Sequence, residues 1–473
     1  MIWLVLAAIF TRSLERVTTL DPALAQSVYD CRAAGLVYER VLDIDYSARP
    51  YRLTPGACEL PETSADGLEY VFRMRSREVT AEDAARSLER LRDPGIVSPN
   101  GWILKNVDTI EARDVALHIR LKKPQRVFPW LMAMPCSSVL KPDGSGSGPY
   151  RLESWWKNHE MVFKRKTPDP RAFDTVRYLV VDDASTQWLM FLRGELDLLG
   201  EISRDNWDAV VGPGGQLDDR LVRQGVELYS MPTLETLYIG FNMKDPVLGT
   251  NKKLRQALNC AFDFPEWARF YQNRVEPAYS PVPPQVAGAL SDPSPYAFDL
   301  EKAKRLMAEA GYPGGIDPQT GRRLTLTLAI GRASQDSREA GELLAAFFER
   351  IGVKLELKFY TWDAFLKAVN EGRVQLYRMG WVGDYPDAEN FLQLFHSRNV
   401  SPGPNHSAYC NPAFDAAFDA EDFRLCQEIL REDCPWIFTH FNKANSLVRP
   451  RVGNYLPSDF PYGQEFYYEN RGD

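Results

Sequence analysis

The segment from residue 324 to residue 359 constrains the fold most, because its hydrophobic period changes twice. Apolar and polar residues alternate over residues 324–330 and again over residues 353–359. Between these runs, apolar residues from 343 to 348 have helical spacing, and Gly352 is expected to end the helix. A strand, a helix and a second strand at this spacing predict a βαβ unit, and hence a parallel sheet in this half of the chain.

The loops of such a sheet are where ligands tend to bind, because the carboxyl ends of parallel strands meet at one edge. Residues 336–338 and Trp362 are expected in or beside these loops. Arg338 is expected at a helix start, where its charge opposes the helix dipole. This position favours a specific anionic partner, and a solvated charge is the alternative.

Local signals elsewhere indicate further helices and a domain boundary. Thr80 and Asp83 have the spacing of a capping box ahead of an amphipathic helix. Asp299 is expected to cap another helix, which Gly311 stops. The Gly-rich stretch 143–149 is expected to be a boundary between domains.

Composition indicates a large globular protein, and the sequence argues against several function classes. The 473 residues suffice for two or three domains, and 44% hydrophobic with 25% charged residues are ordinary globular values. A net charge of −8 without a basic patch argues against nucleic acid as a partner. No nucleophile elbow, phosphate-binding loop or zinc-protease motif is present, so we expect no catalytic residues and no enzyme.

The cysteines and histidines indicate neither a metal site nor a cofactor. The seven cysteines show no CxxC or Cys/His ligand spacing, and the five histidines are scattered. An odd number of cysteines leaves at least one free thiol. The sequence does not assign pairs among the others.

The N-terminus begins with an apolar run over residues 2–10, which is too short to span a bilayer. It lacks the basic segment and small-residue cleavage site of a signal peptide, and no lipobox cysteine follows. We expect residues 3–9 to form a β-strand. The remnant of an export signal is the alternative.

The segment 378–391 is an aromatic loop, punctuated by glycine, with a carboxylate at its centre. Trp381 and Tyr385 offer large rigid faces, and Gly383 lets the backbone approach another molecule. Asp384 adds one fixed negative charge. This chemistry suits a small cationic group, such as the N-terminal ammonium of a peptide. The alternative is a turn with a core tryptophan and a turn-forming aspartate.

This loop resembles the signature of the extracellular solute-binding proteins, family 5, which serve ABC importers of oligopeptides and dipeptides. Further segments resemble that family in the same order along the chain, and together they cover most of it. These segments are residues 19–22, 36–39 (matched to the family's first helix), 79–91, 146–150, 238–242 and 254–258.

The resemblance implies an α/β fold with two lobes: the periplasmic-binding-protein fold of class II type in its three-domain variant, with mixed sheets and a central cleft. Lobe one, domain I, would comprise residues 1–35, 146–240 and 440–473. Residues 36–145 would form an inserted domain II, and residues 241–439 would form lobe two, domain III.

The implied function is to capture short peptides in the cleft and deliver them to an ABC permease in the membrane, without a cofactor. The protein would be a monomer in the periplasm or associated with the cell envelope. An oligosaccharide-binding member of the family and an inactive, non-transport paralogue are the alternatives.

The resemblance also implies which residues bind the ligand. Asp384 would hold the α-ammonium group, and Trp381 and Trp362 would line the pocket, although a core position is the alternative for both tryptophans. Arg338 stands at the position for the carboxylate of dipeptides, and Arg378 at the position used for longer peptides. The remaining candidates are Tyr385 and Val382 in the same loop, Glu39 in the first lobe and Trp102 in the second domain.

Overall fold

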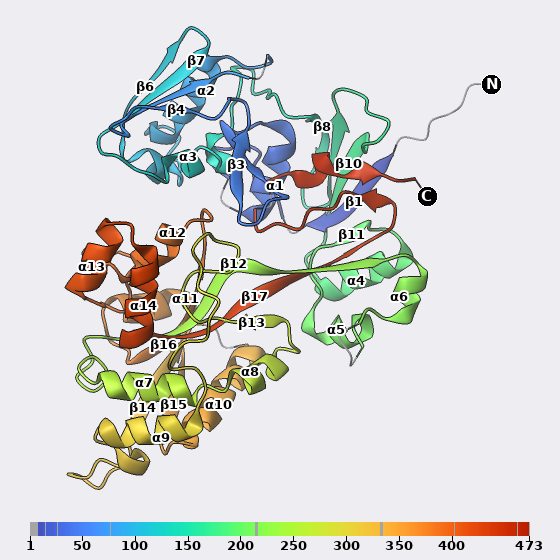
Figure 1. Ribbon diagram of the computed structural model, residues 1–473. Coiled ribbons are helices and arrows are strands. Elements are labelled where there is room, and N and C mark those ends of the chain that lie inside the picture. The colour runs from blue at the N-terminus through green and yellow to red at the C-terminus, as the bar shows by residue number, and fades with distance from the viewer. Residues whose placement is uncertain are drawn as a thin grey trace. The chain divides into compact units, whose positions relative to one another are not determined.

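The computed structural model describes residues 8–472, apart from residues 15, 26, 76, 213–215, 332–333, 402 and 461. The chain forms two compact units: Met1–Met231 with Ala444–Asp473, and Pro232–Lys443. Two long strands, β12 (Glu227–Phe241) and β17 (Trp436–Val448), contribute residues to both units (Figure 1). The division into domains I, II and III stays a prediction.

The main sheet of the first unit has the strand order β11-β1-β10-β9-β8. Its strands are β1 (Ile9–Leu14), β8 (Tyr150–Trp156), β9 (Glu160–Arg165), β10 (Thr175–Val180) and β11 (Leu198–Leu199). β1 runs parallel to β10 and β11, whereas β9 runs antiparallel to β8 and β10. Phe10, Phe163 and Tyr178 are among the buried side chains of its core.

A smaller antiparallel sheet of the first unit has the order β4-β5-β7-β6. Its strands are β4 (Glu62–Thr63), β5 (Glu69–Arg73), β6 (Val107–Arg113) and β7 (Ala116–Leu121). Helix α2 (Ala81–Glu89) packs against β6 and β7 (Figure 1). Thr80 and Asp83 form the predicted capping box at its start.

Short helices and strands complete the first unit. They are α1 (Val28–Val37), β2 (Leu42–Asp45), β3 (Arg52–Pro55), α3 (Phe128–Leu131), α4 (Ala184–Arg193), α5 (Arg204–Val210), α6 (Asp219–Arg223), β18 (Val452–Gly453) and β19 (Glu469–Asn470), with the 3-10 turns η1 (Arg90–Arg92), η2 (Gly101–Leu104), η3 (Pro135–Ser137) and η7 (Gln464–Tyr467). The predicted strand over residues 3–9 is wrong at residue 8, because β1 begins at Ile9; residues 3–7 lie outside the described part.

The sheet of the second unit has the order β15-β14-β16-β12. Its further strands are β14 (Thr325–Ile330), β15 (Lys354–Phe359) and β16 (Leu376–Val382), and β13 (Val275–Pro277) pairs with β17. β14 runs parallel to β15 and β16, and α10 (Gln335–Glu349) packs against β15. The predicted βαβ unit and parallel sheet are therefore confirmed.

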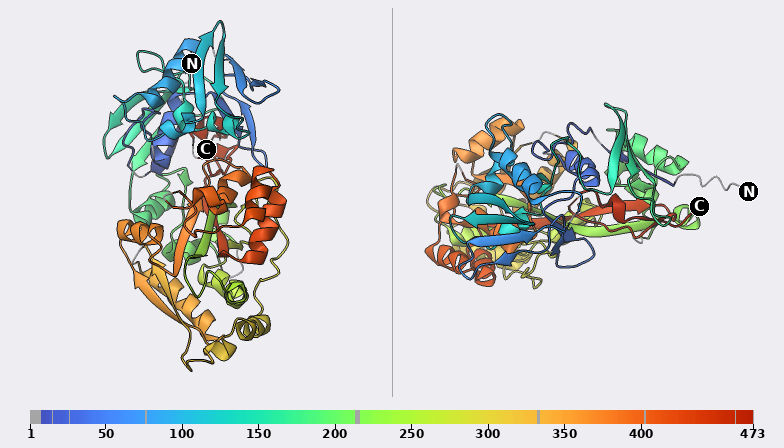
Figure 2. Two further views of the ribbon diagram at one scale, coloured as in Figure 1. Left: turned by 90° about the vertical axis from the view of Figure 1, so that its left-hand side faces the viewer. Right: turned by 90° about the horizontal axis from the view of Figure 1, so that it is seen from above.

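Helices surround this sheet. They are α7 (Lys252–Ala261), α8 (Phe264–Phe270), α9 (Leu300–Glu309), α11 (Trp362–Asn370), α12 (Ala388–Leu392), α13 (Pro412–Asp419) and α14 (Phe423–Asp433), with the 3-10 turns η4 (Pro313–Gly315), η5 (Gln393–Phe395) and η6 (Ser397–Asn399). Asp299 caps α9 as predicted. Helix α13 packs beside α14, as the neighbouring orange-red helices in Figure 1 and in the left view of Figure 2 show. Among the described residues, no helix combines the length and the apolar character needed to cross a membrane.

Candidate functional site

A cavity of about 660 Å³ lies in the second unit at the carboxyl end of β14, beside residues 378–380 of β16. This volume is within the range of small-molecule sites, about 300–1,000 Å³. Its lining residues are Leu237, Tyr271, Ile330, Gly331, Ser334, Asp336, Ser337, Trp362, Arg378, Met379 and Gly380. Two predicted site residues, Trp362 and Arg378, are thus brought together at the edge of a parallel sheet.

Arg378 contributes the positive charge of this cavity. It lies on β16, half-buried, and its Nη2 donates a hydrogen bond to the hydroxyl of Tyr271, 2.8 Å away. Burial and, to a smaller extent, the charge of Arg378 lower the pKa of the neighbouring His440 to about 3. His440 is therefore neutral, and among the described residues that line the cavity Arg378 is the basic one.

Trp362 offers an aromatic face, because 54% of its surface is exposed. It is the first residue of α11 and stacks on Phe365, with ring centroids 5.5 Å apart. A side chain at Gly331 would place its Cβ 2.9 Å from Trp362 and 2.8 Å from Phe365. The glycine is required for this close approach, and Trp362 is not a core tryptophan.

Trp381 and Asp384 are connected through Asn390, which is fully buried. The Oδ1 atom of Asn390 accepts hydrogen bonds from Trp381 Nε1 at 2.9 Å and from the Asp384 backbone N–H at 3.3 Å. Its Nδ2 atom donates to Asp384 Oδ2 at 3.5 Å. Asn390 therefore fixes the loop after β16, although it was not among the predicted residues.

The carboxylate of Asp384 is not neutralised by a basic side chain in the described part of the chain. The residue is accessible to solvent, yet the protein atoms around its carboxylate remove part of its hydration. This desolvation raises the pKa of Asp384, and the hydrogen bond from Asn390 opposes the rise. The group is suited to a cationic partner from outside the chain.

The other residues of this loop have different environments. Tyr385 is buried, with 6% of its surface exposed, and its hydroxyl donates a hydrogen bond to Glu389. Val382 is 64% exposed at the end of β16. A Cβ at Gly383 would lie 2.6 Å from the ring of Phe391, so this position accepts only glycine without rearrangement.

Arg338 lies in the first turn of α10, as predicted, and is exposed. Its guanidinium carbon lies 4.5 Å from the ring centroid of Phe359, the last residue of β15. Its neighbour Ser337 lines the cavity, whereas Arg338 is not among the lining residues. The structure thus places it beside the cavity.

Glu39 and Trp102 belong to the first unit. Glu39 follows α1, which ends at Val37, so the segment matched to the family's first helix extends beyond that helix. It lines a separate cavity of about 310 Å³ together with Arg40 and Arg75. Trp102 lies in η2 and is 46% exposed. Neither residue lines the cavity of the second unit.

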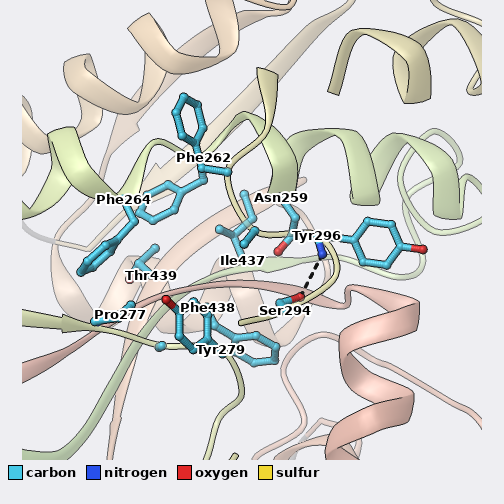
Figure 3. Close-up of a pocket in the computed structure, with 13 residues that line it drawn as sticks. Asn259, Phe262, Phe264, Pro277, Tyr279, Ser294, Tyr296, Ile437, Phe438 and Thr439 are labelled. Carbon is cyan, nitrogen blue, oxygen red and sulfur yellow. Dashed lines mark hydrogen bonds between the residues drawn. The ribbon is translucent and has the colours of Figure 1, made fainter. Parts of the chain in front are cut away.

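A third cavity, beside β13 and β17 in the second unit, has a volume of only about 50 Å³ (Figure 3). The rings of Phe262, Phe264 and Phe438 lie around it. This volume is far below that of a site for a small molecule. We interpret it as a packing gap.

The comparison with protein families decides the family. Residues 19–402 match the model of the bacterial extracellular solute-binding proteins, family 5 (middle). The chain belongs to this family. Family 5 members are periplasmic substrate-binding proteins of transport systems rather than enzymes, so the expectation that this chain is not an enzyme is confirmed.

Relatives of this family 5 protein are named for different ligands. Heme-binding protein A of Haemophilus influenzae is 26% identical, with 91% of this chain and 86% of the relative covered. The dipeptide-binding protein of Escherichia coli is 23% identical, with 94% and 90% covered. The glutathione-binding protein GsiB of Escherichia coli K12 is 24% identical, with 89% and 86% covered.

Solved structures show the same fold. The unliganded open form of the periplasmic murein tripeptide-binding protein MppA gives a TM-score of 0.82 at 22% identity, covering 98% of this chain and 96% of that chain. HbpA2 of Haemophilus parasuis gives 0.84 at 22% identity, covering 98% and 100%. The predicted fold class, the two-lobed α/β fold of periplasmic binding proteins, is therefore confirmed.

Proposed function

We propose that this family 5 protein captures short peptides and delivers them to an ABC permease. The carboxylate of Asp384 is the observation that carries this proposal. It lacks a basic partner within the described chain, its pKa is raised by desolvation, and it follows the strand that contributes Arg378 to the cavity. A free peptide carries the two complementary groups, an ammonium and a carboxylate.

The two peptide ends would use different parts of the site. Asp384 would accept hydrogen bonds from the α-ammonium group, because an ionised carboxylate is a strong acceptor. Arg378, in the cavity, would donate to the α-carboxylate of longer peptides, and Arg338, beside it, to that of dipeptides. The exposed face of Trp362 would pack against ligand side chains with little chemical selectivity.

The remaining predicted residues would make smaller contributions. Trp381 and Tyr385 would support the loop through Asn390 and Glu389, and exposed Val382 would contact the ligand. Glu39 and Trp102 would contribute from the first unit. The protein would act as a monomer.

Titration calorimetry with free and capped peptides tests this proposal. We expect Ala-Phe and Ala-Phe-Ala to bind, and their N-acetylated, C-amidated forms to bind at least about tenfold more weakly, because both end charges are absent. Asp384→Asn should reduce the affinity for free peptides only. Glu301→Gln, at an exposed position of α9, is the control.

Binding of capped and free peptides with equal affinity would contradict the proposal. So would binding of a neutral oligosaccharide in the absence of any peptide binding, which would identify a sugar-binding member of the family.

A further inference from the structure

Strands β12 and β16 share a face of the sheet in the second unit that extends past the cavity. Their antiparallel register pairs Glu235 with Val382, Leu237 with Gly380, and Ile239 with Arg378. Residues paired across two strands point to the same side of a sheet. Along one strand, every second residue points to that side. Glu235 therefore shares a face with Leu237, Gly380 and Arg378, all three of which line the cavity.

Gly380 leaves the space that the carboxylate of Glu235 occupies. A Cβ at Gly380 would lie 3.2 Å from Glu235 Oε1 and 2.9 Å from Leu237 Cδ1. The carboxylate oxygen thus lies over the backbone of a residue that lines the cavity. The carboxylate is therefore next to the part of the cavity wall that Leu237 and Gly380 form.

Glu235 has a hydrogen-bond partner but no ion-pair partner among the described residues. Its Oε2 atom accepts a hydrogen bond from Asn442 Nδ2 at 2.7 Å. No described basic side chain forms an ion pair with it; Arg378 is near enough to act on its charge but donates its hydrogen bond to Tyr271. Burial raises the pKa of Glu235, and Asn442 and Arg378 oppose the rise.

We propose that Glu235 binds a side-chain cation of the ligand, so that the protein prefers peptides containing lysine or arginine. This inference rests on the proposed function, in which Asp384 and an arginine already take the two main-chain ends. A half-buried carboxylate is costly without a partner, and a cationic side chain supplies one. A neutral side chain would displace water from Glu235 without replacing its hydrogen bonds.

Matched tripeptides test the role of Glu235. Alanine tripeptides with lysine at position one, two or three would be compared with peptides containing norleucine, whose side chain has a similar stem but no ammonium. We expect wild-type protein to bind the lysine peptide about tenfold more tightly at one of these positions. Glu235→Gln should weaken only that peptide and bring the ratio to within about twofold.

Two controls separate this inference from the proposed function. Asp384→Asn should weaken lysine and norleucine peptides by the same factor, and Glu301→Gln should change neither. Equal affinity of wild-type protein for both peptides at all three positions would overturn the inference alone. Equal weakening of both by Glu235→Gln would also overturn it, since that result indicates a positioning role. Absence of binding by any peptide would overturn the proposed function and this inference together.

Discussion

At the scale of single residues, the surroundings of a carboxylate distinguish the candidate site from the rest of the acidic surface. Many acidic residues are paired locally, as Glu356 is with Lys354 and Glu301 with Lys304. Asp384 and Glu235 instead accept hydrogen bonds from the neutral amides of Asn390 and Asn442. Neutral partners hold a carboxylate in place without cancelling its charge, which leaves that charge for a ligand.

Substitution of Asp384 should have opposite effects on stability and on binding. Its pKa is raised in the folded protein, so ionisation disfavours the fold once the pH exceeds the unfolded pKa. Asp384→Asn should therefore leave the melting temperature at pH 7 unchanged or slightly higher, and the difference should vanish as the pH falls below both pKa values. Peptide affinity should fall by about 2 kcal/mol, the value of a hydrogen bond between charged groups.

Thermal melts at pH 3 to 7 and calorimetry of the same variant measure the two effects. A large loss of stability at pH 7 would contradict the assignment, because it would show that Asp384 stabilises the fold. Peptide affinity of the wild type should also decrease as the pH falls through the raised pKa, since the protonated carboxyl no longer pairs with an ammonium.

Substitution of Gly331 should disturb the wall of the cavity. The added Cβ of Gly331→Ala would lie within 3 Å of Trp362 and Phe365, so both rings must move. We expect the free energy of unfolding to fall by about 1–3 kcal/mol, which is typical of overpacking. We also expect the tryptophan fluorescence to change. Gly95→Ala, in an exposed loop beside only the Asp93 carboxylate, is the control and should cost less. Unchanged stability and fluorescence in Gly331→Ala would contradict this packing.

At the scale of helices and strands, sequence patterns predicted the features that depend on residues close together in the chain. The capping box of α2, the cap of α9 and the βαβ unit follow from residues close in sequence, and the structure confirms them. The parallel sheet in turn indicated that residues 336–338 and Trp362 lie in or beside the ligand-binding loops, and Asp336, Ser337 and Trp362 line the cavity; Arg378 was expected from the family resemblance alone. The start of β1 at Ile9 was missed, because pairing with Thr175 of β10 defines it rather than the apolar run.

The hydrogen-bond partners of Arg378 and Glu235 could not be predicted either, because they also depend on contacts between residues far apart in the sequence. Tyr271 reaches Arg378 from a position 107 residues away in sequence, and Asn442 reaches Glu235 across 207 residues. No periodicity encodes these distances. Asn390 was the nearest to being predictable, since it lies six residues from Asp384 in a short capped helix.

The capping box of α2 should make a measurable local contribution. Thr80 Oγ1 accepts a hydrogen bond from the Asp83 backbone N–H at 3.2 Å, and Asp83 Oδ2 accepts one from the Thr80 backbone N–H at 3.0 Å. Thr80→Ala removes the first of these and should cost about 1 kcal/mol in urea unfolding. Thr80→Ser keeps the hydroxyl and should retain most of the stability. Equal losses in both variants would show that the methyl group, not the cap, stabilises the helix.

At the scale of the whole chain, a buried ionic cluster joins distant parts of the sequence within the first unit. Glu465 in η7 accepts hydrogen bonds from Arg12 of β1 and Arg32 of α1, each at 3.0 Å. The Glu465 side chain is fully buried. The first unit is thus completed only when the C-terminal segment, after the chain returns through β17, meets the N-terminal elements.

This cluster predicts an acid-sensitive first unit. Burial by itself would raise the pKa of Glu465, but the charges of Arg32 and Arg12 outweigh that effect and lower it. A carboxyl whose pKa is lowered on folding stabilises the protein above its unfolded pKa, and this contribution is lost as the pH falls through the folded value.

Glu465→Gln should therefore cost about 3–5 kcal/mol at pH 7, because two buried guanidinium groups lose their shared anion. Urea unfolding at pH 7 measures the loss, with Glu469→Gln in exposed β19 as the control. The gap between Glu465→Gln and wild type should narrow in acid, and a gap that stays constant down to pH 3 would show that the cost arises from packing rather than from charge.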